Sequence, residues 1–295
     1  MSLVEKALLK VKETAPRTPR VHREGVTKTA DPGTQSLAPP VAPAASGRVV
    51  SVNVAGLRVA GLLAPEHEER QLAQQYRQIK RPLIANAIGR GAPRLPNGHL
   101  VMVASAMPGE GKTFTAINLA LSMSIEKDAH VLLVDADVAK PHISTLLGVP
   151  DAPGLLDVLR DPGLDVESVI LQTDVPNLSF LPAGTRSEEA TELLASARME
   201  QVTHAIGMRD ERRVTLFDSP PLLLTTESHA LAQVAGQVVV VVRAGSTPQQ
   251  VLLDALSYLG GHPAVSLVLN QCMLTSPSAY HYAGYGAGRS DPAQT

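Results

Sequence analysis

The chain has 295 residues, of which 44% are hydrophobic and only 3% aromatic, so it can bury a core that must be largely aliphatic. Its 26 Lys and Arg residues nearly balance 28 Asp and Glu residues, which argues against a nucleic-acid-binding protein. The single cysteine, Cys272, excludes an intramolecular disulfide and a cysteine-cluster zinc site.

The hydrophobic residues are not arranged to cross a membrane. The longest run of valine, Val238 to Val242, is far shorter than the roughly 18 apolar residues that a membrane-spanning helix needs. Charged residues interrupt the apolar residues at the N-terminus, which lacks a signal-peptide core. We therefore expect a cytoplasmic protein.

The N-terminal region differs in composition from the rest. Its first 48 residues hold eight Lys and Arg, four Asp and Glu, and six prolines, a mixture that cannot bury enough apolar surface to offset the ordering of the backbone. We predict a flexible basic arm over residues 1–65, in which residues 2–12 could form a short amphipathic helix. The arm could lie near an anionic membrane face or be a solvated tail, and the sequence does not separate these alternatives.

From residue 66 the pattern is that of a globular domain. Residues 66–80 predict a helix that Pro82 ends or kinks. Apolar runs typical of strands buried on both faces follow, with helices expected at about 111–126 and within 187–208. These runs lie at residues 99–106, 130–137, 177–184, 213–220, 237–244 and 265–272. Strands that alternate with helices predict an α/β fold over residues 66–273, with a mostly parallel sheet and helices on both faces, followed by a mobile tail over 274–295.

The segment Ala106 to Thr113 reads AMPGEGKT, directly after one predicted strand and at the start of a helix. It matches a phosphate-binding P-loop, in which glycines let backbone N–H groups surround phosphate oxygens, except that Ala106 replaces the first glycine. Lys112 would contact the β- and γ-phosphates and Thr113 would bind Mg²⁺. The predicted nucleotide-binding residues here are Met107, Pro108, Gly109, Glu110, Gly111, Lys112, Thr113 and Phe114.

Three aspartates stand where predicted strands end. Asp135 and Asp137 follow the strand after the P-loop helix, and Asp218 follows another buried strand. A lone aspartate in such a place is more often a helix cap, but ligands of open α/β sheets gather at the carboxyl ends of the strands. Two or three carboxylates that converge next to a P-loop therefore predict a magnesium site, which the Thr113 hydroxyl would complete.

The segments ASAMPGEGKT, VLLVDADVAKP and LFDSPP together resemble the bacterial tyrosine kinases of capsule and exopolysaccharide systems, and most specifically the exosortase-associated tyrosine autokinases. The resemblance implies a P-loop NTPase fold related to the MinD and ParA ATPases, with ATP and Mg²⁺ as cofactors. It implies catalytic roles for Lys112, Asp135, Asp137 and Asp218, where Asp135 binds metal or accepts the proton of the tyrosine hydroxyl. Asp137 would position metal or substrate, and Asp218 would hold a metal-bound water.

Two further positions are interpreted through the resemblance. Asn270, at the end of the last predicted strand, resembles the residue that contacts adenine, although a turn residue is the alternative. The family often has arginine where Ala139 stands here, and it is open whether the following Lys140 replaces it or is simply solvated.

Tyrosines gather near the C-terminus. Tyr280, Tyr282 and Tyr285 are three of the five tyrosines in the chain and lie among Ser, Gly, Ala and His. A tail of this composition can reach a neighbouring active site, so we predict autophosphorylation of these residues in trans; a terminus without chemistry is the alternative.

The resemblance also implies partners. Family members are thought to assemble into rings through an ExxRxxR helix, whose counterpart here is Gln74, Arg77 and Lys80, although an ordinary solvated helix face is the alternative. A separate membrane chain-length-determinant protein, a polysaccharide co-polymerase, is expected to activate the kinase and to recruit it to the inner face of the plasma membrane. The kinase would then regulate exopolysaccharide or capsule synthesis.

Two other functions are compatible with a P-loop. A MinD/ParA-like switch ATPase would act by nucleotide-dependent assembly, but those proteins carry a second lysine where Met107 stands here. A nucleotide-binding module with vestigial catalysis is the third alternative, and the intact set of Lys112, Thr113 and three aspartates argues against it.

Overall fold

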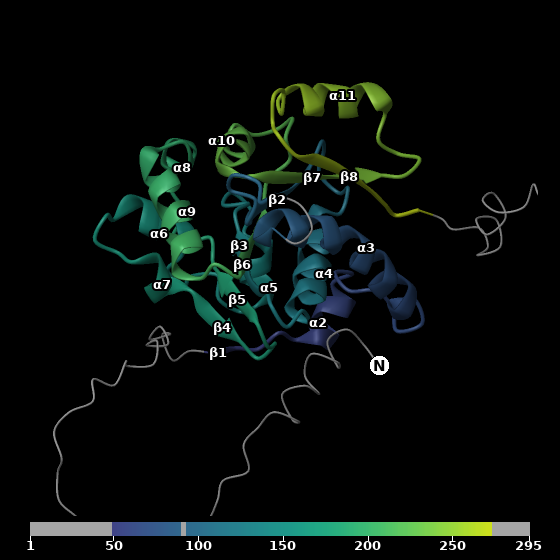
Figure 1. The fold of residues 1–295 in the computed structure, drawn as a ribbon, viewed down its shortest axis with the longest axis horizontal. Coiled ribbons are helices and arrows are strands. Elements are labelled where there is room, and N and C mark those ends of the chain that lie inside the picture. The colour runs from purple at the N-terminus through teal and green to yellow at the C-terminus, as the bar shows by residue number, and fades with distance from the viewer. Residues whose placement is uncertain (1–48, 90–92, 273–295) are drawn as a thin grey trace, which may run out of the picture.

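The structure is a computed structural model that describes residues 49–89 and 93–272 (Figure 1). The predictions for residues 1–48 and for the tail tyrosines lie outside the described residues. Among the helices that are described, none combines the length and the apolar character needed to span a bilayer.

The described residues form an eight-stranded sheet with the order β1-β4-β5-β3-β6-β2-β7-β8. All neighbouring strands are parallel except β4 and β5, which are antiparallel. The strands are β1 (Val49–Val50), β2 (Leu100–Ser105), β3 (His130–Asp135), β4 (Leu171–Thr173), β5 (Leu178–Leu181), β6 (Arg213–Asp218), β7 (Gln237–Arg243) and β8 (Val265–Asn270). The predicted α/β class with a mostly parallel sheet is confirmed.

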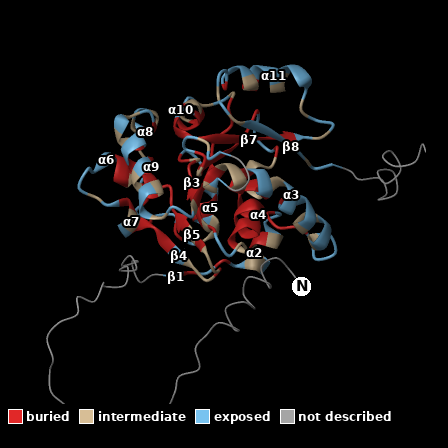
Figure 2. Cartoon of the chain, viewed as in Figure 1, coloured by how far each residue is buried: buried red, intermediate tan, exposed pale blue. Residues whose placement is uncertain are grey.

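Helices cover both faces of the sheet (Figure 1). They are α2 (Val54–Val59), α3 (Glu69–Ile88), α4 (Lys112–Ser124), α5 (His142–Leu146), α6 (Leu155–Arg160), α7 (Val166–Val169), α8 (Ala190–Leu194), α9 (Ala197–Arg209), α10 (Glu227–Val234) and α11 (Gln249–Ser257). Alternate residues of one strand enter opposite cores: Met102 belongs to the core that contains residues of α6, α9 and α10, whereas Val103 belongs to the core that contains residues of α2, α3 and α4. The central strands are accordingly buried, except for the half-buried first residues of β3 and β6 (Figure 2).

The predicted boundary at residue 66 does not match the structure. Residues 49–65 belong to the folded domain, since β1 pairs with β4 and α2 buries Leu57 in the same core as α4. Leu62 and Leu63 are also buried there. The segment contains many apolar residues, but Val49 and Val59 are 64% and 92% exposed, whereas Val50, Leu57 and Leu62 belong to the core that also contains residues of α3 and α4.

The sequence predicts that Pro82 ends or kinks helix α3, and the helix does not end there. It continues to Ile88 and ends at Gly89, whose φ of 77° is the left-handed conformation typical of a glycine cap. Proline removes one backbone donor, but the turn that follows buries Leu83, Ile84 and Ala87 in the core. Apolar burial therefore outweighs the lost hydrogen bond.

The last predicted strand was expected to be buried on both faces, and this is wrong for β8. Strand β8 lies at the edge of the sheet, where Val265, Leu267 and Leu269 are 39%, 55% and 63% exposed. The helix predicted within 187–208 is two helices, α8 and α9. An edge strand and a central strand can have the same apolar composition, because only neighbours in space decide burial.

Candidate nucleotide and phosphoryl-transfer site

The P-loop joins β2 to α4, as the sequence predicts. Gly109 and Gly111 have φ values of 79° and 97°, in the left-handed region that residues with a Cβ rarely adopt. A Cβ on Gly111 would also come within 2.0 Å of Asn270 Nδ2. Both the backbone turn and the close approach of β8 therefore require glycine at position 111.

The buried Glu110 side chain stabilises the conformation of this loop. Its carboxylate is buried and accepts a hydrogen bond of 2.8 Å from Met107 N, while Thr247, from the turn after β7, donates to its other oxygen. Ser105 Oγ donates to Met107 O at 2.8 Å. The Glu110 side chain and the Met107 amide thus hold the shape of the loop, whereas both residues had been predicted to contact the nucleotide.

A cleft of about 410 Å³ opens at the loop. It brings together the predicted residues Gly109, Gly111, Lys112, Thr113, Phe114 and Asn270, and it adds Gly61, Leu62, His142 and Gln271. Asn270 Nδ2 donates to Glu110 O at 2.9 Å, so its amide is anchored to the loop. Gly61 and Leu62 come from the segment after α2 that the sequence had assigned to the arm.

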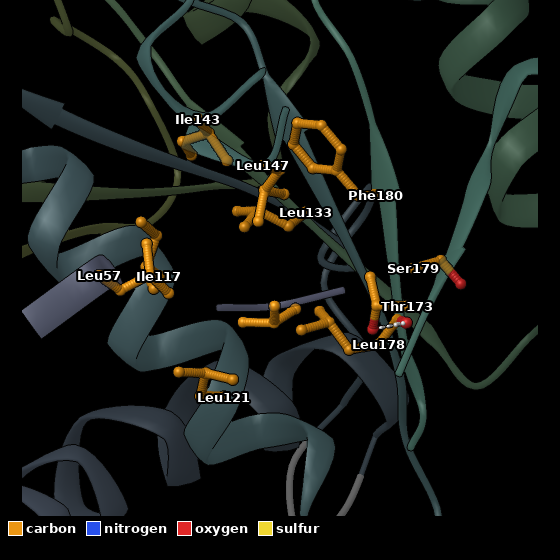
Figure 3. Close-up of a pocket in the computed structure, with 11 residues that line it drawn as sticks. Leu57, Ile117, Leu121, Leu133, Ile143, Leu147, Thr173, Leu178, Ser179 and Phe180 are labelled. Atoms are coloured by element: carbon orange, nitrogen blue, oxygen red, sulfur yellow. Dashed lines mark hydrogen bonds between the residues drawn. The ribbon is translucent and has the colours of Figure 1, made fainter. Parts of the chain in front are cut away.

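A second cavity lies between α2, α4, α5 and β5 and is much smaller, about 20 Å³ (Figure 3). Its lining is almost entirely aliphatic and includes Leu57, Ile117, Leu133 and Leu178, and Figure 3 shows these side chains converging on it. A space of this size holds at most about one water molecule. It is a packing gap, and the predicted P-loop residues line the larger cleft instead.

Asp135 and Asp218 end two adjacent strands, β3 and β6, and are direct register partners. Both are buried, at 0% and 1% exposed. Lys112 opens α4 next to them, with Nζ 3.7 Å from Asp137 Oδ2. The structure therefore brings together all four residues that were predicted to be catalytic.

Each of the two buried carboxylates has an oxygen without a partner. Asp135 Oδ2 accepts hydrogen bonds of 2.8 Å from both Ser144 N and Ser144 Oγ, whereas Asp135 Oδ1 and Asp218 Oδ1 accept none in the described part of the chain. Unsatisfied buried polar atoms are uncommon in native proteins and cost free energy. Oxygens of this kind beside a P-loop lysine fit a site that is completed by a bound cation or substrate.

The pKa values follow from this burial. Burial raises the pKa of Asp135 to about 6, although the hydrogen bonds from Ser144 oppose the rise. Burial raises the pKa of Asp218 to about 8, and the charge of Asp135 raises it further, against the opposing effects of Lys112 and a hydrogen bond from Thr113. A nearby cation would lower both values, because it favours the charged carboxylate.

Within residues 49–89 and 93–272, no group of three or more His, Cys, Asp or Glu side chains is placed to bind a metal by itself. This agrees with the chemistry of Mg²⁺, which usually takes one or two protein carboxylates and completes its shell with water and phosphate oxygens. Thr113, Asp135 and Asp218 fit that pattern, with both aspartates at the carboxyl ends of neighbouring strands.

The three residues predicted to form an oligomer interface do not share one exposed face. Gln74 and Arg77 are exposed on α3, but Lys80 is 4% exposed. Lys80 Nζ donates to Ser122 O at 2.5 Å, at the end of α4, and pairs with Glu126 at 2.8 Å. Lys80 therefore ties α3 to the negative end of the α4 dipole, and its inclusion in the interface is wrong.

Three residues of the site were missed by the sequence reasoning. Ser144 contacts Asp135, His142 lines the cleft, and Thr247 contacts Glu110. None of them belongs to a motif, and their partners lie up to 137 residues away, so the sequence carries no local signal for them. Lys140 is exposed, and its backbone N donates to Asp137 Oδ1 at 3.3 Å.

Comparisons with known proteins agree with this geometry. A family described as an AAA domain matches residues 98–256, which is more than half of the chain. The tyrosine-protein kinase YwqD of Bacillus subtilis is 30% identical over 215 residues, which cover 72% of this chain and 86% of that protein. The chain belongs to the bacterial tyrosine kinase family.

Other members of the kinase family are longer. The putative tyrosine-protein kinase EpsB of Ralstonia nicotianae is 32% identical over 189 residues, which cover 64% of this chain but 24% of EpsB. Among solved structures, the VpsO kinase domain has a TM-score of 0.58 at 26% identity and covers 70% of this chain and 100% of that domain. The BceF tyrosine kinase domain has the same TM-score and identity, and the match covers 73% of this chain and 86% of that domain. The predicted family is confirmed, and the exosortase-associated subfamily stays a prediction.

Proposed function

We propose that this protein is an ATP-dependent protein-tyrosine kinase that phosphorylates tyrosines of its own C-terminal tail. The observation that carries the proposal is the meeting of the P-loop Lys112 with two buried carboxylates, Asp135 and Asp218, each with an unpartnered oxygen. The membership in a family of tyrosine-protein kinases supports the choice of tyrosine as acceptor.

The nucleotide would bind in the cleft at the P-loop. Loop amides after Gly109 and the N-terminus of α4 would hold the phosphates, and Lys112 would offset the charge that develops on the transferred group. Asn270 would lie beside the base. Thr113 and Asp218 would hold Mg²⁺, which supplies further charge neutralisation at the phosphates, and Asp135 beside them would keep Oδ1 for the substrate.

Asp135 is suited to accept the proton of the attacking hydroxyl. Its pKa of about 6 leaves it charged at neutral pH, and Oδ1 has no competing donor. A bond forms between the tyrosine oxygen and the γ-phosphorus while the bond from that phosphorus to the β–γ bridging oxygen breaks. ADP leaves, and the proton passes to Asp135.

The proposed acceptors are Tyr280, Tyr282 and Tyr285 of a neighbouring copy. Of the proposed ring contacts, Gln74 and Arg77 are exposed and available, whereas Lys80 is not. The family resemblance further supports a membrane chain-length-determinant protein as activator, recruitment to the membrane, and a role in exopolysaccharide synthesis.

The deciding experiment maps phosphate on the full chain by mass spectrometry after incubation with Mg-ATP, with and without the activator. We expect phosphotyrosine in the tail of the wild type and in Lys127→Met, a control at an exposed lysine beyond the end of α4, and none in Lys112→Met. Labelling that is absent from the tail or unchanged in Lys112→Met would overturn the proposal. ATP hydrolysis with ATP-dependent dimerisation and no phosphotransfer would instead favour a MinD/ParA-like switch.

A further inference from the structure

Ser144 makes an unusual set of contacts with the proposed proton acceptor. It lies in the short helix α5, is 1% exposed, and donates from both N and Oγ to the same oxygen, Asp135 Oδ2, at 2.8 Å. Its Oγ also accepts a hydrogen bond of 3.2 Å from Ala183 N, beyond the end of β5. A hydroxyl has one proton to donate, so the donor from Ala183 occupies a lone pair and leaves that proton for Asp135.

This arrangement fixes the plane of the Asp135 carboxylate. The two oxygens of a carboxylate are chemically equivalent, but the torsion that turns the group is broad, so without fixed donors its plane can rotate. Two donors on one oxygen, Oδ2, hold that plane in one orientation. The other oxygen, Oδ1, has no partner among the described residues and is left for substrate.

We propose that Ser144 is a positioning residue for phosphoryl transfer, which acts by holding Asp135 so that Oδ1 meets the tyrosine hydroxyl. The inference rests on the proposed function. Reacting groups must be held in near-attack geometry, and small misplacements slow a reaction without weakening substrate binding. Ser144 does not line the nucleotide cleft, so its loss should alter the rate of transfer and leave nucleotide affinity alone.

A purely structural role makes a different prediction, because Ser144 also ties α5 and the end of β5 to β3. If stability were its only contribution, the rate for folded protein would follow stability across a series of variants. Two substitutions separate stability from rate. Ser144→Cys keeps the volume but weakens the donor, whereas Ser144→Thr keeps the hydroxyl but adds a methyl group to a packed site.

The experiment measures single-turnover transfer to tail tyrosine, nucleotide affinity and thermal unfolding for full-length variants. We expect transfer about tenfold slower in Ser144→Ala and in Ser144→Cys, with nucleotide affinity within about twofold of wild type. Ser144→Thr should transfer at nearly the wild-type rate although it unfolds at a lower temperature. Ser228→Ala is the matched control, because Ser228 is 0% exposed and donates to a backbone oxygen, that of Thr225, at 2.8 Å.

Wild-type rates in folded Ser144→Ala and Ser144→Cys would overturn the inference, and so would rates that follow unfolding temperature across Ser144→Cys, Ser144→Thr and Ser228→Ala. If Ser144→Ala does not fold, the Cys and Thr variants decide. A wild type that binds nucleotide but transfers no phosphate would overturn the proposed function and this inference with it. An active wild type with an equally active Ser144→Cys would overturn the inference alone.

Discussion

Strands β3 and β6 lie side by side in register, and the ionisable side chains at their two ends differ in whether they have partners. They begin at His130 and Arg213, which are register partners, and they end at Asp135 and Asp218, which are register partners as well. The first pair is engaged in ion pairs, whereas the second pair retains unpartnered oxygens.

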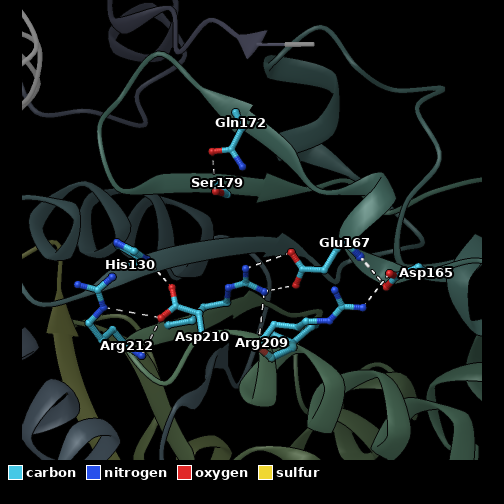
Figure 4. Close-up of polar contacts among 10 residues, drawn as sticks. His130, Asp165, Glu167, Gln172, Ser179, Arg209, Asp210 and Arg212 are labelled. Atoms are coloured by element: carbon cyan, nitrogen blue, oxygen red, sulfur yellow. Dashed lines mark hydrogen bonds and ion pairs between the residues drawn. The ribbon is translucent and has the colours of Figure 1, made fainter. Parts of the chain in front are cut away.

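At the beginning of the strands, basic side chains meet acidic ones (Figure 4). His130 pairs with Asp210, and Arg213 contacts both oxygens of Glu167 in a forked arrangement. Arg209 Nη2 lies 2.9 Å from Asp165. These charges satisfy one another, so this end is arranged for stability.

At the carboxyl ends of the strands, Asp135 and Asp218 each keep an oxygen that has no partner among the described residues. Burial raises the pKa values of Asp135 and Asp218, which means that their charged forms cost free energy in the protein without ligand. Groups whose pKa is displaced by burial and by specific charge partners are typical of functional sites. Within one strand pair, the acids at one end have basic partners and support the fold, whereas the acids that keep an unpartnered oxygen are those that we propose to bind and react.

The largest expected effect comes from Asp218→Asn. We expect the rate of phosphotransfer to fall by about 10² to 10³-fold, because the neutral amide lacks the negative charge that would hold a cation near the phosphates. The unfolding free energy of the nucleotide-free protein at pH 7 should stay the same or increase. Burial raises the pKa of Asp218 to about 8, so this carboxyl must take up a proton on folding at neutral pH, and the amide avoids that cost. Radiolabel transfer and urea unfolding measure the two quantities. A variant that loses both activity and stability would show that Asp218 supports the fold, and the contrast between the two ends would fail.

The second prediction concerns the opposite end. Arg213→Ala leaves Glu167 unpaired at 12% exposure, and we expect it to destabilise the protein by about 3 kcal/mol. The folded variant should keep its kinase activity, because the pair lies at the other end of the strand from Asp218. Urea unfolding measures the loss of stability. The control is the double variant Arg213→Met with Glu167→Leu, which removes both charges and should recover most of the lost stability. Loss of activity in folded Arg213→Ala would contradict the separation of the two ends.

The smallest effect is expected from Asp210→Asn. Burial acts to raise the pKa of Asp210, but the hydrogen bonds from His130 and the Arg212 amide, with the charges of His130 and Arg213, outweigh it and hold that pKa below its ordinary value. A lowered pKa contributes stability above the unfolded value of about 4, and this contribution is lost as the pH falls through the folded value. Asp210→Asn should therefore lower the free energy of unfolding by on the order of 1 kcal/mol at pH 7, and by less below about pH 4.

Urea unfolding of both proteins from pH 7 to pH 3 tests this prediction. A difference that stays constant across the range would show that the charge of Asp210 is not what stabilises the fold.

Much of the site could be predicted from the sequence because it consists of contiguous residues. The P-loop needs two left-handed glycines followed by Lys112 and Thr113, and the strand-end aspartates adjoin long apolar runs. The contacts that orient these groups could not be predicted. Ser144 and Thr247 have ordinary sequence surroundings. Thr247 reaches Glu110 across 137 residues, and although Ser144 is only 9 residues from Asp135, the contact depends on how α5 packs after β3.

The sequence by itself determined the α/β class and the positions of the glycine-rich loop and of the aspartates at the strand ends, because local backbone geometry and strand patterning depend on neighbouring residues. Only the tertiary structure decided that residues 49–65 join the core, that Lys80 caps α4 instead of facing a partner, and that one oxygen of Asp135 is held while the other is left free. These outcomes depend on which distant segments pack together. Burial and hydrogen bonding then act on each group according to its neighbours in space.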